Sequence, residues 1–238
     1  MADPVSDFPH LKAVNQYGFY CIPEEFRTRE VAKLLLAGKV NEPRTLKIMQ
    51  QFMDNGDVIS GGAFIGDFLP ILSRTATRGA FIHSFEPNPT GFAATTHTIA
   101  FNGLKNVKLS PVAVGREAAV LPLKIAKSGG APLGGMSRIV DAPIEGQTVD
   151  VQMRRLDDLV PEGRKVTIVQ LDVEGHEWPA LEGARRIISD SQPLIVLETL
   201  VGQEPEETAQ NLREMCPTAG YQFMGMMERN AFYRPLDR

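Results

Sequence analysis

Short apolar runs alternate with segments of helical periodicity along most of this chain, and this alternation predicts its fold. Runs that suit buried strands occupy residues 58–59, 81–85, 107–114, 166–171 and 194–197. Between them, apolar residues recur at helical spacing over residues 68–77, 89–101, 179–188 and 205–216. Two final runs flank Arg229 and Asn230 and form a hairpin pattern over residues 221–227 and 231–233. We predict an α/β fold with a doubly wound, mostly parallel sheet and an antiparallel terminal hairpin.

The N-terminal part of the chain departs from this alternation. Residues 1–22 show little periodicity and are expected to form a loose lead-in. A helix is expected to open at residues 23–25 and end near Gly38, and a second one to begin at Pro43 with Asn41 as its cap. We therefore divide the chain into an N-terminal segment, 1–54, that serves as a lid or subunit contact, and a main domain, 55–238.

A glycine-rich loop separates two alternating segments in the middle of the main domain. The alternation over residues 118–126 and 148–153 predicts strands, and the loop spans Ser128 to Arg138. Such a loop is either a flexible connection between the strands or a mobile flap that closes over a site.

Composition and charge narrow the range of partners. The chain has 238 residues, of which 43% are hydrophobic and 23% charged, so it is long enough to bury a substantial core. Its net charge is -4, its pI is about 5.6, and it has no run of Lys or Arg. A nucleic-acid partner is therefore not expected, because the electrostatic footprint for a phosphate backbone is missing. A small substrate is expected instead, and a homo-oligomer is compatible with the sequence.

The cysteines and apolar segments indicate the compartment. Cys21 and Cys216 are far apart and have no metal-ligand spacing, which favours two buried thiols over a disulfide. The first ten residues lack the basic start and apolar core of a signal peptide. No apolar run approaches the roughly 18 residues that span a bilayer. We expect a cytoplasmic protein without a membrane partner.

The stretch from Asp57 to Asn88 carries the first chemical signal. An apolar run enters a turn that contains Gly61, Gly62 and Gly66, and a second apolar run ends on Glu86. Glycines let the backbone approach a ligand, and an acid about 20 residues further on suits the ribose hydroxyls of a nucleoside. A strand-to-helix turn without a ligand is the alternative interpretation.

The glycine spacing distinguishes between cofactors. If Gly61 is the first position of a dinucleotide turn, the third position must also be glycine. That position is Ala63, so the pattern is broken. A turn for S-adenosylmethionine (SAM) usually reads acid-x-Gly-x-Gly-x-Gly, and two of its three glycines are present. Its four key positions fall on Ser60, Gly62, Phe64 and Gly66.

Three further segments resemble the FkbM family of SAM-dependent methyltransferases. They are FEPNP (85–89), NGLKNV (102–107) and LDVEGHEWPALEGA (171–184), and an apolar strand that ends on Glu198 follows. The resemblance covers about 56–233. It implies the Rossmann-like, seven-stranded sheet of class I methyltransferases, with an N-terminal helical extension here. It also implies SAM as cofactor and methylation of a hydroxyl on a sugar, glycan or polyketide-like metabolite.

The resemblance also implies roles for individual residues. Gly62 and Gly66 would form the turn under the methionine part of SAM, Glu86 would bind the ribose, and Pro87 and Asn88 would lie beside the adenosine. The adenine would be lined by Val112 and Ala113, whereas Asp172 and Glu174 would lie beside the sulfonium and the substrate. The family usually has Asp in place of Ser60 and Asn in place of Phe64, so Asp67 is considered as a substitute contact for the methionine amino group.

Methyl transfer to a hydroxyl requires alignment and removal of a proton, but no acid for the leaving group. His176 alone among the four histidines follows a predicted strand end, so it is the candidate general base; a supporting role at the helix start is the alternative. Asp172 and Glu174 are candidates for direct roles. Together with Glu198 they would also suit Mg²⁺, which prefers oxygen ligands, although we do not favour a metal.

We therefore predict a SAM-dependent O-methyltransferase that acts on a small molecule or a glycan. A non-catalytic SAM-binding module is one alternative, suggested by Ser60 and Phe64. An NAD-dependent oxidoreductase is the other, and the broken glycine spacing disfavours it.

Overall fold

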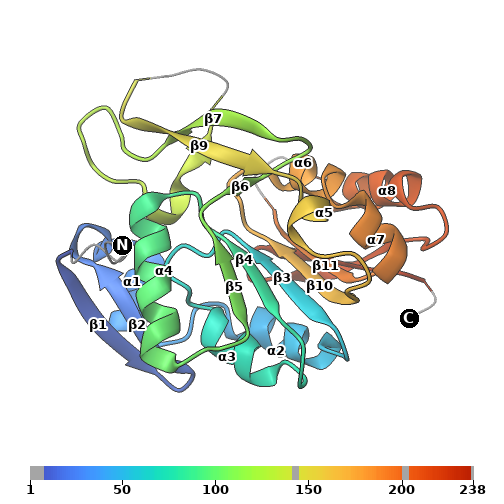
Figure 1. The fold of residues 1–238 in the computed structure, drawn as a ribbon, viewed down its shortest axis with the longest axis horizontal. Coiled ribbons are helices and arrows are strands. Elements are labelled where there is room, and N and C mark those ends of the chain that lie inside the picture. Colours follow the sequence, from blue (N-terminus) through green and yellow to red (C-terminus); the bar gives the residue numbers. More distant parts are fainter. Residues whose placement is uncertain (1–7, 141–144, 200–203, 237–238) are drawn as a thin grey trace.

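A seven-stranded sheet forms the centre of the molecule in the computed structural model, which describes residues 8–140, 145–199 and 204–236 (Figure 1). β13 pairs antiparallel with β11 and β12, and the other neighbouring strands are parallel. This arrangement confirms the predicted fold class, including the terminal hairpin. In spatial order the strands are β12 (Gln222–Met227), β13 (Asn230–Arg234), β11 (Leu194–Glu198), β10 (Val166–Leu171), β3 (Asp57–Gly61), β4 (Ile82–Phe85) and β5 (Val107–Ser110).

Helices cover both faces of this sheet because successive residues of each buried strand point to opposite sides. Ile59 and Val169 face one helical layer, and their neighbours Val58 and Ile168 face the other. The first layer contains α5 (Leu156–Leu159), α6 (Glu177–Glu182), α7 (Arg185–Ser191) and α8 (Pro205–Met215). The second contains α2 (Pro43–Phe52) and α3 (Leu69–Thr75). Helices on both faces of a mostly parallel sheet are what the doubly wound prediction requires.

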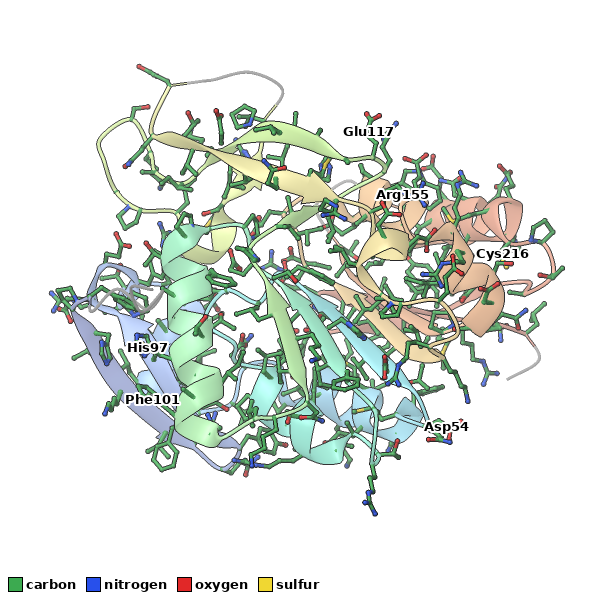
Figure 2. All side chains as sticks on the ribbon, viewed as in Figure 1. Asp54, His97, Phe101, Glu117, Arg155 and Cys216 are labelled. Atoms are coloured by element: carbon green, nitrogen blue, oxygen red, sulfur yellow. The ribbon has the colours of Figure 1, made fainter. Side chains whose placement is uncertain are left out.

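The N-terminal segment is more ordered than the sequence indicated. The expected loose lead-in contains an antiparallel hairpin, β1 (His10–Asn15) and β2 (Gly18–Pro23), which lies against α4 (Pro89–Asn102). His97 and Phe101 of α4 point toward this hairpin in Figure 2, and the His10 and His97 rings stack with 5.4 Å between their centroids. The hairpin escaped detection because Leu11, Val14 and Phe19 are exposed, which hides the usual apolar-in, polar-out alternation.

The helices of this segment also differ from the expectation. Residues 24–26 form only a short 3-10 turn, and α1 begins later (Glu30–Leu36). Asn41 is not the cap of α2: the residue before the helix is Glu42, and the carboxylate of Glu228 accepts hydrogen bonds from the N–H groups of Arg44 and Thr45. A distant acid therefore takes the place of a local cap, which sequence spacing cannot indicate.

A second sheet of four strands lies above one end of the central sheet. Its order is β6 (Ala113–Val114), β9 (Thr148–Arg154), β7 (Ala119–Lys124) and β8 (Arg138–Ile139). The strand predicted over 107–114, with an interruption at Pro111, divides there into β5 and β6, which belong to different sheets, so it is not one irregular strand. Pro111 lacks the N–H group that a continuous ladder would use.

The helix predicted over 179–188 is also two helices, α6 and α7. Gly183 lies at their junction, where an added Cβ would come within 2.1 Å of the carbonyl oxygen of Gly115. The chain must therefore bend to fit against the segment that follows β6. Cys21 and Cys216 are free and buried, as predicted. Within the described ranges, no helix combines the length and apolar character needed to cross a membrane.

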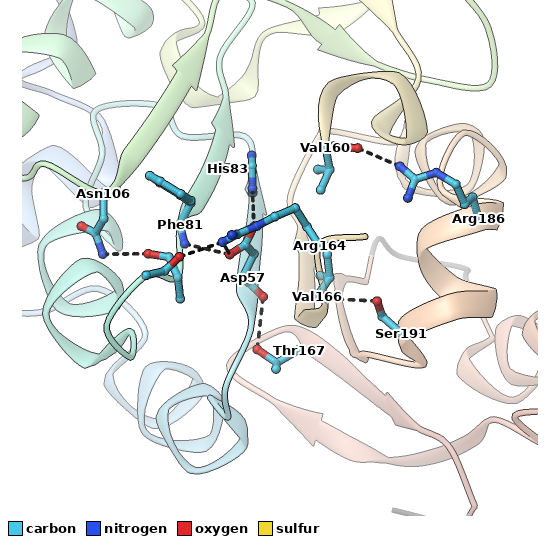
Figure 3. A network of polar contacts seen from close by, with 12 residues as sticks. Asp57, Phe81, His83, Asn106, Val160, Arg164, Val166, Thr167, Arg186 and Ser191 are labelled. Atoms are coloured by element: carbon cyan, nitrogen blue, oxygen red, sulfur yellow. Dashed lines mark hydrogen bonds and ion pairs between the residues drawn. The ribbon is translucent and has the colours of Figure 1, made fainter. Parts of the chain in front are cut away.

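A buried acid, Asp57, stabilises the amino-terminal end of the parallel strands (Figure 3). Asp57, at the start of β3, is fully buried and accepts hydrogen bonds from the N–H of Phe81 at 2.8 Å and from Arg164 Nε at 2.9 Å. His83 Nε2 lies 2.8 Å from the same carboxylate. Burial raises the pKa of Asp57, but the bonds from Arg164, Phe81 and His83 outweigh it and hold the pKa below its ordinary value.

We predict that Asp57→Asn lowers the free energy of unfolding by about 2–3 kcal/mol at pH 7, since it removes charged hydrogen bonds at a buried site. A depressed pKa means that this contribution is present above the unfolded pKa of about 4 and is lost as the pH falls further. The difference between the variant and the parent should therefore shrink in acid. Urea denaturation at several pH values measures both effects.

The matched control is Asp54→Asn, which removes the exposed ion pair of Asp54 with Lys165. Its effect should stay below about 1 kcal/mol because exposed pairs are screened by water. Equal effects of the two substitutions would contradict the structural role assigned to Asp57.

Candidate functional site

A cavity of about 630 Å³ opens at the carboxyl ends of the parallel strands. In doubly wound sheets this edge is where ligands bind, because the strand order reverses there and leaves a crevice. The turns after β3, β4 and β10 contribute to its walls, as do the N-terminal residues 28–31 and 41–42 and the loop residues 133–137. The cavity is therefore the candidate site.

The turn after β3 is shaped by its glycines. Gly62 has φ +82°, and an added Cβ would lie 1.7 Å from the carbonyl oxygen of Asp172. Only glycine fits there, because the turn after β3 touches the backbone after β10. Backbone strain is concentrated around this cavity, since it is lined by residues with positive φ that are not glycine: Glu42 (47°), Phe64 (51°), Glu174 (55°), Glu228 (51°) and Arg229 (74°).

Glu86 joins the first two turns of the sheet. Its Oε2 accepts a hydrogen bond from the N–H of Phe64 at 2.6 Å, and its Oε1 accepts one from the N–H of Asn88 at 2.9 Å. Burial raises the pKa of Glu86 to about 7, although both backbone bonds act in the opposite direction. Glu86 lines the cavity and is held by N–H groups, so each oxygen keeps a lone pair for further donors such as ribose hydroxyls.

A neutral pair lies where the resemblance described above implies an acid. The Oγ of Ser60 donates a hydrogen bond to Oε1 of Gln170 at 2.8 Å, and the two residues are direct neighbours on β3 and β10. Ser60 is 4% exposed and Gln170 5%. Since Oε1 faces Ser60, the side-chain NH₂ of Gln170 is left to face the cavity, which Gln170 lines. Sequence reasoning missed Gln170, although a lone amide in an apolar strand was a signal.

Several carboxylates gather at the other end of the cavity. Oxygen atoms of Asp172, Glu174 and Glu198 all lie within 4.8 Å of one another. Burial, followed by repulsion from Glu198, raises the pKa of Glu174 to about 7, and the same two causes raise that of Asp172 well above its ordinary value. Burial raises the pKa of Glu42 to about 7 as well.

The predicted substitute contact, Asp67, belongs to the same group. Its Oδ2 accepts a hydrogen bond from Asn41 at 3.0 Å, and burial raises its pKa to about 6. It precedes α3 by two residues. Electrostatic repulsion links it to Glu42, so the acids of this end form one connected set.

His176 occupies the residue before α6 and lines the cavity. Its Nε2 lies toward Gly115, where an added Cβ would come within 3.2 Å of it. The turn that carries it is fixed by Glu177, whose carboxylate accepts hydrogen bonds from the N–H groups of Val173 and Gly175. The imidazole ring thus lies between the carboxyl end of β10 and Gly115, which follows β6.

The glycine-rich loop covers the cavity next to Phe64. Its residues Gly134 and Gly135 pack against the Phe64 ring, and Phe26 contacts the other side with 5.4 Å between ring centroids. Asn88 Nδ2 donates a hydrogen bond to Ser137 Oγ at 2.9 Å, which ties the loop to the turn after β4. The loop contains a 3-10 turn (Gly134–Met136), so it is more than an irregular connection.

The structure brings nearly all the sequence-predicted site residues together around one cavity. The residues that line it are Ser60, Gly62, Phe64, Gly66, Asp67, Glu86, Pro87, Val112, Ala113, Asp172, Glu174 and His176. Asn88 does not line it: its Oδ1 accepts hydrogen bonds from the N–H groups of Thr90 and Gly91 and so caps α4. Gln170 lines it as well, and so do Glu42 and Arg229, which had not been predicted because they come from segments with no motif.

Comparison with known families identifies the family of this chain. Residues 60–223, more than half of the chain, match the family described as the methyltransferase FkbM domain. The chain belongs to the FkbM methyltransferase family. This confirms the resemblance seen in the sequence and supports SAM as the cofactor in place of a nicotinamide dinucleotide. A comparison with curated protein sequences found no match.

Solved structures share the fold at low sequence identity. A methyltransferase FkbM from Methylobacillus flagellatus KT is similar with a TM-score of 0.55 and 16% identity, over 76% of this chain and 43% of that one. Trm5b from Pyrococcus abyssi is similar with a TM-score of 0.52 and 12% identity, over 96% of this chain and 56% of that one. This chain therefore spans about half of the length of these two proteins.

The cavity fits SAM in its shape and its donor and acceptor groups. The glycine turn lines the cavity, and the Glu86 carboxylate offers acceptors for two hydroxyls. Val112 and Ala113 offer an apolar wall for a base. The carboxylates near Asp172 would balance the positive sulfonium and ammonium groups.

We predict that Gly62→Ala weakens binding of S-adenosylhomocysteine at least ten-fold and destabilises the fold, since the backbone after β10 must move away from the new methyl group. Gly79→Ala is the matched control, because Gly79 also has positive φ (90°) but no atom lies within 4 Å of the added Cβ. Gly79→Ala should lower the free energy of unfolding by only about 1–2 kcal/mol, the cost of backbone strain, and should leave binding unchanged. Similar binding losses in both variants, measured by calorimetry, would contradict the close approach.

We predict that Glu86→Gln weakens S-adenosylhomocysteine binding by about 1–3 kcal/mol, the scale for hydrogen bonds to a charged group. Because the pKa of Glu86 is about 7, binding to the parent protein should strengthen as the pH rises through 7 and the carboxylate forms. The variant should lack this pH dependence. Unaltered affinity in Glu86→Gln would show that the ribose binds elsewhere.

Proposed function

We propose that this protein transfers a methyl group from SAM to a hydroxyl of a small molecule or glycan. The observation that carries the proposal is the division of one cavity into two ends. One end has Glu86 and the apolar residues Val112 and Ala113, which suit a nucleoside. The other end has Asp172 and Glu174, and His176 follows them along the chain with its Nε2 toward Gly115; these groups suit the deprotonation of a hydroxyl beside the donor.

The chemistry divides between the cofactor and the chain. SAM supplies a methyl group that is already attached to a positive sulfur. The residues of the chain must hold donor and acceptor in line, exclude water and remove the hydroxyl proton. Phe64, packed between Phe26 and the glycine-rich loop, supports the exclusion of water on one side of the cavity.

Two residues suit the role of general base. A base works best when its pKa is near the working pH. Glu174 meets this condition, because its pKa is about 7 and it lies beside Asp172. His176 is the other candidate, because histidine is the side chain that most often acts as a general base, although its Nε2 lies toward Gly115.

The charge distribution supports a small acceptor over a nucleic acid. The net charge is -4, and the acids named above stand around the inner end of the cavity. A phosphate backbone would be repelled from these groups. The proposal therefore excludes a nucleic-acid partner and a membrane partner.

The proposal is tested by a methyl-transfer assay with radiolabelled SAM and a panel of hydroxylated acceptors. With an acceptor in hand, we expect His176→Ala to lower kcat by about 10²- to 10⁴-fold, the range for loss of a general base. Affinity for S-adenosylhomocysteine should stay within about two-fold, because the base contributes to the transition state only.

Glu174→Gln is the matched comparison for this prediction. A loss of turnover confined to Glu174→Gln would assign the base to Glu174 and refute the role of His176. Equal loss of turnover and cofactor affinity in His176→Ala would instead make His176 a residue of the binding site or the fold.

A further inference from the structure

The N-terminal segment brings a cation to the cavity from outside residues 60–223, the part of the chain that matches the FkbM family. Within the described ranges, the arginine side chains that line the cavity are those of Arg29 and Arg229. Arg229 forms an ion pair with Glu198 at 3.1 Å. Arg29 forms no ion pair with any residue that the structure describes, and its Nη1 donates to a thioether, the Sδ atom of Met136, at 3.8 Å. Because this sulfur is a weak acceptor, the charge of Arg29 is available to a ligand.

Arg29 lies beside the turn after β3, where the methionine part of SAM is expected. An added Cβ on Gly134 would come within 3.1 Å of the Phe64 ring and 3.4 Å of Arg29 Cγ, so both side chains approach the same point of the glycine-rich loop. The backbone of Arg29 is fixed as well. Its N–H donates to the carbonyl oxygen of Phe26 at 2.8 Å, and its own carbonyl oxygen accepts from the N–H of Lys33 at 2.9 Å. The side chain therefore extends from a fixed backbone to a position next to the turn.

The turn itself, residues 60–67, offers no side-chain donor to a carboxylate. The hydroxyl of Ser60 donates to Gln170 at 2.8 Å. Phe64 has an apolar ring, and Asp67 is an acid. The other five residues of the turn are Gly, Ala and Ile. A side-chain partner for a carboxylate at this turn must therefore come from another segment of the chain.

The charges of the cofactor match what the two sides of this turn provide. SAM and S-adenosylhomocysteine both end in an α-amino acid, so an ammonium group and a carboxylate share one carbon atom. Moving a carboxylate from water into a cavity is costly unless it is paired. Arginine is well suited to this pairing, because its planar guanidinium presents two parallel N–H groups to the two oxygens. Asp67 lines the cavity at the end of the turn and suits the ammonium group, whereas Arg29 suits the carboxylate.

We propose that Arg29 binds the carboxylate of the methionine part of SAM, so that the N-terminal segment completes the cofactor site. The guanidinium exchanges its weak contact with the Met136 sulfur for charge-assisted hydrogen bonds to the carboxylate oxygens. The N-terminal segment is then part of the cofactor site as well as a wall of the cavity. The inference concerns the cofactor alone, so it goes beyond the proposed function and holds for any methyl acceptor.

The test uses two ligands that differ by one carboxylate. S-adenosylhomocysteine and its decarboxylated analogue share the adenosine, the sulfur and the ammonium group. Binding of each ligand to the full chain is measured by calorimetry. We expect the parent protein to bind S-adenosylhomocysteine about ten-fold or more tightly than the analogue, which is the scale for hydrogen bonds between charged groups.

Arg29→Gln identifies the guanidinium as the cause of this difference. We expect its affinity for S-adenosylhomocysteine to fall about ten-fold or more and its affinity for the analogue to stay within about two-fold, so that the two ligands bind almost equally. Arg29→Lys keeps the charge but loses the two parallel donors, so its affinity for S-adenosylhomocysteine should lie between those of the parent and Arg29→Gln. Arg27→Gln is the matched control, because Arg27 pairs with Glu24 and does not line the cavity, and it should leave both affinities unchanged.

Each other result would overturn the proposal in a recognisable way. Equal weakening of both ligands by Arg29→Gln would make Arg29 a support of the glycine-rich loop, and unchanged affinities would show that the carboxylate binds elsewhere. Slower methyl transfer with unchanged S-adenosylhomocysteine affinity would assign the guanidinium to an anionic acceptor. These outcomes leave the proposed function intact, whereas failure of the parent protein to bind S-adenosylhomocysteine at all would refute both. The expected binding results without methyl transfer to any hydroxyl would refute the proposed function alone.

Discussion

The carboxylate of Glu86 is the interaction on which the site depends. Glu86 directly follows β4. Its carboxylate accepts hydrogen bonds from the N–H of Phe64 in the turn after β3 and from the N–H of Asn88 at the start of α4. Two loops that are far apart in the chain are thereby fixed to each other by one buried acid. The acid that suits the ribose is therefore also the group that holds the glycine turn in shape. Because burial raises its pKa to about 7, the integrity of this end of the cavity is linked to pH.

Buried acids at the two ends of the central sheet have opposite surroundings. At the amino ends of the strands, Asp57 is surrounded by Arg164, His83 and an N–H group, so its charge is satisfied within the protein and its pKa is depressed. At the carboxyl ends, Asp172 and Glu174 have other acids as neighbours, and their pKa values are raised. The first arrangement stabilises the fold, and the second costs stability. Fold stability and ligand binding are thus separated along the length of the same strands.

Much of the fold followed from periodicity, and the site followed from the motifs at the strand ends. The strand at 166–171 was predicted with its observed bounds because a nearly apolar run leaves little choice. Glu86, Asp172 and Glu174 could be assigned to one site because parallel strands end at the same edge. The β1–β2 hairpin and the capping of α2 by Glu228 could not be predicted, since one hides its alternation in exposed apolar residues and the other joins segments far apart in sequence. Gln170 was missed because its meaning depends on the cross-strand neighbour Ser60, which only the register reveals.

The two departures from the family pattern change how the cavity is built. Ser60 replaces an acid, and its hydroxyl orients the amide of Gln170, so a neutral donor faces the ligand in place of a charge. Phe64 replaces a polar side chain, and its ring packs on Phe26 and on the glycines of the loop that covers the cavity. One substitution removes a negative charge from the floor of the cavity, and the other joins its N-terminal wall to the loop. The carboxyl groups of the cavity are instead those of Asp172, Glu174 and Glu42, and burial raises their pKa values, so they carry less charge at neutral pH than exposed acids do. The cavity therefore combines a neutral pair under the glycine turn with carboxyl groups that are able to exchange a proton near neutral pH.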